Sequence, residues 1–117
     1  MVNIYDNANE MAAQLKKTDE FLAFDKIKKE VYADEASKKM IMDYKKLQIE
    51  AQAKMLGGEE PPAELMEKIK KTGEVLQFNP KITEFFAAEY RFNVLVSELY
   101  KIIFSEVTDL DAGLFDG

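Results

Sequence analysis

The sequence predicts an all-α protein, a helical bundle of about five helices built on a long antiparallel helical hairpin. Apolar residues recur at intervals of three and four along the chain, and no segment shows the alternation that is typical of a strand. Five glycines and three prolines in 117 residues are too few for a sandwich or barrel with many turns. We expect one domain at 1–107, followed by an acidic tail at 108–117 that frays.

Local signals mark the first three helices. Asn3 is a candidate N-cap for a helix over about 3–17, and a second short helix follows over about 18–32. Asp34 is placed to cap a third, longer helix, because its side-chain oxygen can accept a hydrogen bond from an unpaired amide of the first turn. The apolar pattern of this third helix continues to Leu56.

Glycine and proline residues mark the ends and starts of helices in the second half of the chain. Gly57-Gly58 supplies a left-handed stop for the third helix, and the acidic, proline-stiffened linker 59–62 leads into a fourth helix. Asn79-Pro80 is the clearest helix start, because asparagine caps helices and proline suits the first helical position. We expect the fifth helix to run to the end of the folded domain. The third and fifth helices are predicted to be the longest and to lie antiparallel.

Two of these helices carry more apolar surface than one neighbour requires. In the third helix, a second apolar stripe recurs at seven-residue spacing, nearly opposite the first. In the fifth helix, apolar residues cover roughly two-thirds of the circumference, against the ~100° usual for one core contact. A central helix touched on several sides explains this breadth, and so does a second subunit, which we favour as a homodimer or higher oligomer. The candidate interface residues are Met42, Ile49, Leu56, Phe85, Phe92, Leu95, Val96, Leu99 and Ile103.

Composition excludes most catalytic and metal chemistry. The chain has no cysteine and no histidine, so it lacks a thiolate nucleophile, an imidazole base and the usual ligands of structural zinc and iron–sulfur clusters. The acidic tail does not match a calcium loop, because Gly113 stands at the fifth position counted from Asp109, where an oxygen ligand is required. We therefore expect no enzymatic activity, no bound metal and no cofactor.

The charge balance bears on location and partners. The formal net charge is −6, and residues 58–117 carry all of the acidic excess, which argues against a general affinity for nucleic acid or anionic lipid. The apolar runs are too short to span a membrane, and the N-terminus lacks the features of a signal peptide. We expect a cytoplasmic protein.

Several motifs, taken in order over about residues 3–107, resemble one protein family. They are Asn3-Ile4-Tyr5-Asp6-x-Ala8-Asn9-Glu10, Ala36-Ser37-Lys38 leading to Asp43-Tyr44 and Gln48, Asn79-Pro80 before Phe85-Phe86, and Ile102-Ile103-Phe104. In this order they resemble the YlbF/YmcA family of small bacterial helical proteins, most closely its YheA-like branch. The resemblance implies a helical, cytoplasmic, self-associating protein without enzymatic activity. Its better-studied members are regulatory adaptors in competence, sporulation and biofilm development and modulate RNase Y, and some bind an iron–sulfur cluster through cysteines that this chain lacks.

Two functions are consistent with these observations. The first is a protein–protein adaptor or regulator that self-associates and binds another cytoplasmic protein. The second is an RNA-associated accessory protein that uses the lysine-rich faces of the second and third helices. The lysine pairs favour the second function, but each is flanked by acidic residues within a turn, and Arg91 is the single arginine. We therefore favour the adaptor.

Overall fold

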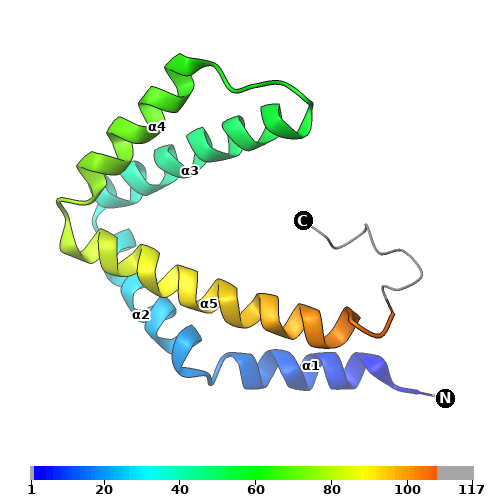
Figure 1. Ribbon diagram of the computed structural model, residues 1–117. Helices are drawn as coiled ribbons and strands as arrows, with labels where there is room; N and C mark the ends of the chain where they lie inside the picture. The colour runs from blue at the N-terminus through cyan, green and yellow to red at the C-terminus, as the bar shows by residue number, and fades with distance from the viewer. Residues whose placement is uncertain (1, 108–117) are drawn as a thin grey trace. The chain divides into compact units, whose positions relative to one another are not determined.

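The computed structural model describes residues 2–107 and contains five helices and no strand within that range (Figure 1). The prediction of an all-α fold is confirmed. The third and fifth helices are the longest, as expected, with 22 and 25 residues. The helices are α1 (Ile4–Leu15), α2 (Asp19–Ala33), α3 (Glu35–Leu56), α4 (Ala63–Leu76) and α5 (Pro80–Phe104).

The chain divides into two compact units, and the boundary between them falls inside two helices. Unit 1 contains α1, the start of α2 as far as Phe24, and α5 from Ala88 onward. Unit 2 contains residues 25–87, and therefore the rest of α2, all of α3 and α4, and the start of α5.

The caps expected from the sequence begin three of the helices. The side chain of Asn3 accepts a hydrogen bond from the amide of Asp6 at 3.1 Å. Asp34 Oδ2 accepts from the Ser37 hydroxyl at 2.6 Å and from the Ser37 amide at 3.3 Å. Asn79 Oδ1 accepts from two amides in the first turn of α5, at 3.0 and 3.4 Å. These short-range bonds satisfy amides that have no partner inside the helix.

A glycine in the left-handed conformation ends α3. Gly58 has a φ of 81°, and it is the only residue in the described range with a positive φ. The amide that follows, of Glu59, donates to the carbonyl of Lys54 at 2.9 Å, which is the long bond of a Schellman motif. The left-handed stop predicted for the glycine pair is thus provided by Gly58, whereas Gly57 keeps a φ of −82°.

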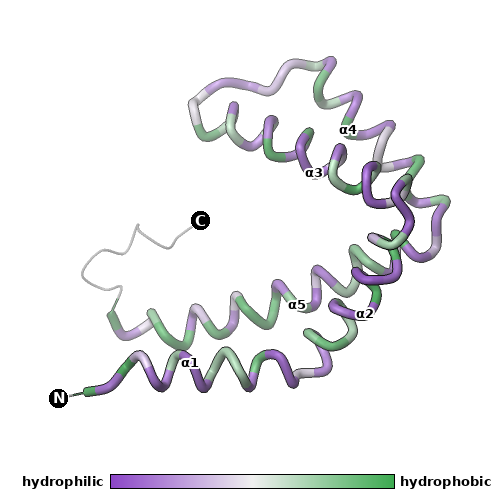
Figure 2. Tube along the Cα trace, turned by 180° about the vertical axis from the view of Figure 1, so that it is seen from behind, coloured by the Kyte–Doolittle hydropathy of each residue, from purple (hydrophilic) through white to green (hydrophobic). Residues whose placement is uncertain are grey.

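The connection after Gly58 turns the chain back, so that α4 lies antiparallel against α3 in unit 2 (Figures 1 and 2). The antiparallel helical hairpin that the sequence predicts is thus formed by α3 and α4 (Figure 1). The short link to Ala63 leaves α4 too little chain to pack elsewhere. Gly73 marks the close approach of the two helices, because a Cβ there would lie 3.3 Å from the hydroxyl oxygen of Tyr44.

The core of unit 2 is aliphatic with a group of aromatic rings at one end. The rings of Tyr32 and Phe85 are 5.9 Å apart between centroids, and those of Phe85 and Phe86 are 5.3 Å apart. Tyr44 of α3 meets Phe86 edge-on at 5.8 Å. These contacts join α2, α3 and α5 within the unit. The buried apolar residues of unit 2 are Ile27, Val31, Ile41, Ala51, Leu65, Leu76, Ile82 and Phe85.

Unit 1 has a much smaller core. Its helix α1 runs beside the C-terminal part of α5 (Figures 1 and 2). Phe92 of α5 packs against Phe21 and Phe24 of α2, with ring centroids 5.7 Å apart in both pairs. In this part of the described chain, Ala88 is the only fully buried apolar residue. The helix α5 ends at Phe104, three residues earlier than predicted, and the tail 108–117 lies outside the described residues.

None of the helices within residues 2–107 is both long enough and apolar enough to cross a lipid bilayer.

The core position of Phe85 gives a first prediction. Phe85→Ala should lower the free energy of unfolding by about 3–5 kcal/mol, because the ring is fully buried and its removal leaves a cavity. Phe78→Ala makes the same change at a ring that is 86% exposed, and should cost less than about 0.5 kcal/mol. Urea unfolding followed by circular dichroism measures both. Equal losses from the two substitutions would contradict the assignment of the core.

The cap of α3 gives a second prediction. The hydrogen bond from the Ser37 hydroxyl, followed by those from backbone amides, lowers the pKa of Asp34 below its ordinary value of 3.8. A carboxylate with a lowered pKa stabilises the folded state above its unfolded pKa, and this contribution is lost as the pH falls through the folded pKa. Asp34→Ala should therefore lower the urea midpoint at pH 7, and the difference in midpoint from wild type should narrow as the pH falls below 3.8. A difference in urea midpoint between wild type and Asp34→Ala that does not change with pH would contradict a stabilising role of the ionised Asp34 side chain.

Candidate interaction surfaces

Unit 1 exposes apolar side chains on both of the helices that form its two-helix layer. None of the twelve residues of α1 is buried. On α5, Ile102 is 71% exposed and Ile103 is 46% exposed. We use the term α1–α5 surface for the exposed apolar side chains of this layer, which are Ile4, Tyr5, Met11, Tyr90, Val94, Tyr100, Ile102 and Ile103.

A single layer of two helices explains this exposure. Each helix of a folded domain buries its apolar stripe against a neighbouring element, and a stable domain has at least two layers. In unit 1, α1 and α5 cover one side of each other, and the start of α2 covers Phe92. The remaining apolar side chains face solvent. Exposed apolar patches of this kind are typical of protein–protein interfaces.

The three candidate residues on the third helix all lie on its exposed side. Met42 is 44% exposed, Ile49 is 64% exposed and Leu56 is 83% exposed. The buried residues of α3, which include Ile41 and Ala51, lie off this stripe, and Ala51 is nearly opposite it. The structure therefore places the seven-residue stripe on the surface of unit 2.

The candidate residues on the fifth helix separate into three groups. Phe85 is fully buried in the core of unit 2, so its inclusion in an interface is corrected: its ring is enclosed by Tyr32 and Phe86. Ile103 is exposed. The half-buried residues are Phe92, Leu95, Val96 and Leu99, which contribute to packing within unit 1 and keep part of their surface accessible.

Sequence reasoning missed the exposed apolar residues of the first helix. Ile4 and Tyr5 belong to the apolar pattern of the predicted first helix, and periodicity alone does not distinguish an exposed apolar stripe from a core stripe. Tyr100 is one of the apolar residues in the broad arc of the fifth helix, and in the structure it is an exposed ring stacked on Phe104, with 5.5 Å between the ring centroids. The available signal was the breadth of that arc, which was correctly read as excess apolar surface.

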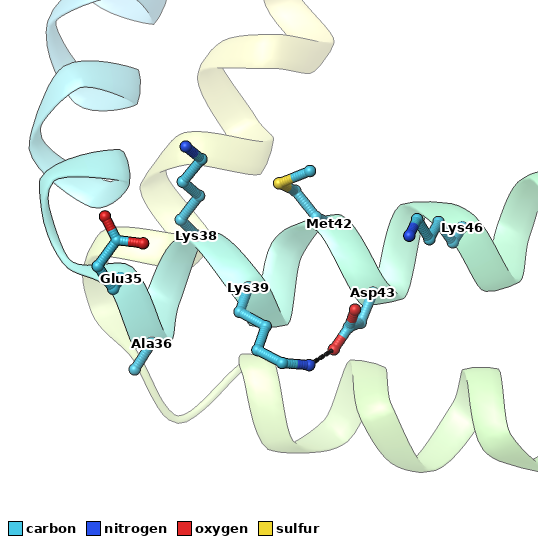
Figure 3. A pocket seen from close by; sticks show the side chains of 7 residues that line it. All are labelled: Glu35, Ala36, Lys38, Lys39, Met42, Asp43 and Lys46. Atoms are coloured by element: carbon cyan, nitrogen blue, oxygen red, sulfur yellow. Dashed lines mark hydrogen bonds and ion pairs between the residues drawn. The ribbon is translucent and has the colours of Figure 1, made fainter.

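An open hollow with a volume of about 600 Å³ lies over the N-terminal half of α3 (Figure 3). Lys38 and Met42 project from the same side of the helix, and Lys39 bends toward Asp43, with which it forms a 2.7 Å ion pair. A smaller hollow of about 280 Å³ in unit 1 is lined by Arg91 and two glutamates, among other residues. Both hollows are lined by charged and apolar side chains.

No group of three or more acidic side chains within residues 2–107 is arranged to hold a metal ion.

Comparison with known proteins places the chain among relatives of the same size. A family model described as "Control of competence regulator ComK, YlbF/YmcA" matches residues 4–108. The chain belongs to the YlbF/YmcA family. The resemblance seen in the sequence motifs is therefore confirmed. This family is associated with regulation and is not a known class of enzymes.

Individual relatives point to the YheA-like branch of the YlbF/YmcA family. A UPF0342 protein of Halothermothrix orenii is 35% identical over 101 residues, which cover 86% of each chain. The UPF0342 protein YheA of Bacillus subtilis is 34% identical over 109 residues, which cover 93% of each chain. The solved structure of YheA from Bacillus subtilis superposes with a TM-score of 0.66 at 28% identity, covering 93% of this chain and 99% of that one.

A second solved structure is similar in fold alone. It is a protein of unknown function (DUF964) from Bacillus stearothermophilus, with a TM-score of 0.75 at 17% identity, and it covers 96% of this chain and 98% of that one.

Proposed function

We propose that this YlbF/YmcA protein is a non-enzymatic adaptor or regulator that works in the cytoplasm as a homodimer or higher oligomer and binds another protein. The observation that carries the proposal is the α1–α5 surface, where a two-helix layer leaves its apolar side chains without a second layer. The description of the family, which names control of a competence regulator, supports a regulatory role.

A second copy of the chain is the simplest source of the missing layer. In a two-fold symmetric dimer each interface residue is used twice, and burying an exposed isoleucine contributes roughly 1.5–3 kcal/mol. A few such residues on each subunit can outweigh the ~4–15 kcal/mol lost when two molecules associate. The part of α5 that belongs to unit 1, residues 88–104, is about 26 Å long, which gives a partner several turns of helix to contact.

Self-association is tested by changing one residue of the α1–α5 surface. Ile103→Asp should raise the dimer dissociation constant by more than a hundredfold, because about 1.5–3 kcal/mol is lost at each of two symmetric positions. The matched control is Ile49→Asp on α3, which makes the same change at an exposed isoleucine of unit 2 and should leave the dimer intact. Sedimentation equilibrium measures the constants, and circular dichroism checks that each variant is folded.

Wild-type protein that sediments as a monomer at tens of micromolar would refute the oligomer.

The adaptor role is tested by affinity capture from the native cytoplasm, with and without ribonuclease. We expect a protein partner that survives ribonuclease treatment and whose capture requires a folded bait. Loss of every captured protein after ribonuclease treatment would favour the RNA-associated function instead.

A further inference from the structure

The net charge of the individual helices singles out α3. It contains five lysines and three acidic residues, whereas each of the other four described helices has at least as many acidic as basic residues. The chain as a whole carries a net charge of −6. A local positive charge within an acidic protein directs acidic partners to that helix.

The lysines of α3 surround an exposed apolar residue. On a helix surface the nearest neighbours of a residue lie three and four positions away in each direction. For Met42 all four of these positions are lysine, namely Lys38, Lys39, Lys45 and Lys46. Lys45 and Lys46 also precede Ile49, by four and three positions. We call Met42, Ile49 and Leu56 the α3 stripe, and the four lysines its rim.

Neighbouring groups hold part of the rim in place. The ammonium of Lys38 lies 6.0 Å from the centre of the Tyr32 ring, and that of Lys45 lies 5.4 Å from the centre of the Phe85 ring. Contacts of this kind help to orient a lysine, since the face of an aromatic ring attracts a cation. The buried position of Phe85 therefore fixes the direction of a rim lysine as well as the core.

We propose that the α3 stripe and its rim form a docking site for an acidic amphipathic helix of a partner protein, and this inference rests on the proposed adaptor function. Residues spaced by seven along a straight helix form a line that a second helix can follow side by side. With 22 residues, α3 is about 33 Å long and presents three such positions. Glutamates flanking the apolar stripe of the partner would meet the lysines of the rim.

The apolar stripe distinguishes this occupant from nucleic acid or a lipid surface. A phosphate backbone needs cations but gains nothing from Ile49 and Leu56, which are among the most exposed aliphatic side chains of unit 2. Two acidic residues of α3, Asp43 and Glu50, also border this side and would repel a polyanion. An acidic helix can avoid this repulsion, because it can carry glutamates opposite the lysines and uncharged residues opposite Asp43 and Glu50.

The probe is a fluorescent peptide of three heptads with leucine at positions a and d and glutamate at e and g, where like charges hinder self-pairing. When this peptide is titrated with the full chain, its fluorescence anisotropy should rise to a plateau.

Ile49→Asp should weaken binding of the peptide at least tenfold, because it places a charge in the apolar contact. Lys46→Glu should weaken it about fivefold, and a peptide with lysine in place of one glutamate should recover part of the affinity for that variant, because its other glutamates still meet the three remaining rim lysines. Lys70→Glu, at an exposed lysine of α4, is the control and should have no effect.

Further control ligands distinguish an acidic helix from the other possible ligands of the α3 stripe. A shuffled peptide of the same composition that binds equally well would overturn the proposal, because charge alone would then explain the affinity. Tighter binding of polyuridylate or of vesicles containing anionic lipid, with the same loss in Ile49→Asp, would assign the stripe to those ligands.

The proposed dimer and the proposed docking site can be tested independently of each other. Ile103→Asp should abolish self-association and keep the affinity for the peptide, whereas Ile49→Asp should do the reverse. Dissociation of the dimer by Ile49→Asp would instead assign the α3 stripe to a second copy and overturn the docking site. A peptide that fails to bind a wild-type dimer would overturn this inference and leave the proposed self-association standing.

Discussion

Four aromatic rings carry the packing on which unit 2 depends. Phe85 contacts Tyr32 of α2 and its own neighbour Phe86, and Phe86 meets Tyr44 of α3 edge-on. The hydroxyl of Tyr44 in turn lies where Gly73 lets α4 approach α3 closely. One connected group of rings therefore touches every helix of the unit. Aromatic residues suit this role because each buries a large area and pairs with its neighbours in defined geometries.

The same ring group links the core to the surface. Lys45 lies over the ring of Phe85 and Lys38 over that of Tyr32, so the core residues also orient cations on the exposed side of α3. Ion pairs at this surface are short-range and exposed, as between Lys39 and Asp43, and contribute little to stability. The aromatic rings therefore contribute both to the packing of the core and to the orientation of these two lysines.

The two units differ in how completely they bury their apolar residues. Unit 2 has a closed core, whereas unit 1 consists of helices that cover each other on one side. The two surfaces proposed for contact differ in the same way. The α1–α5 surface is broad and apolar, which fits a symmetric copy of itself, and the α3 stripe is narrow and rimmed by lysines, which fits an acidic partner.

The sequence by itself determined the features that depend on neighbours along the chain. Asn3, Asp34 and Asn79 cap helices because their side chains reach amides two or three residues away, and Gly58 ends α3 because glycine adopts a positive φ without strain. The helix periodicity and the family motifs are local in the same sense. Only the tertiary structure decided which apolar stripe is core and which is surface, and that α3 pairs with α4. Phe85 and Ile103 are both apolar members of one helical arc, and burial differs between them because burial depends on which other helix lies opposite.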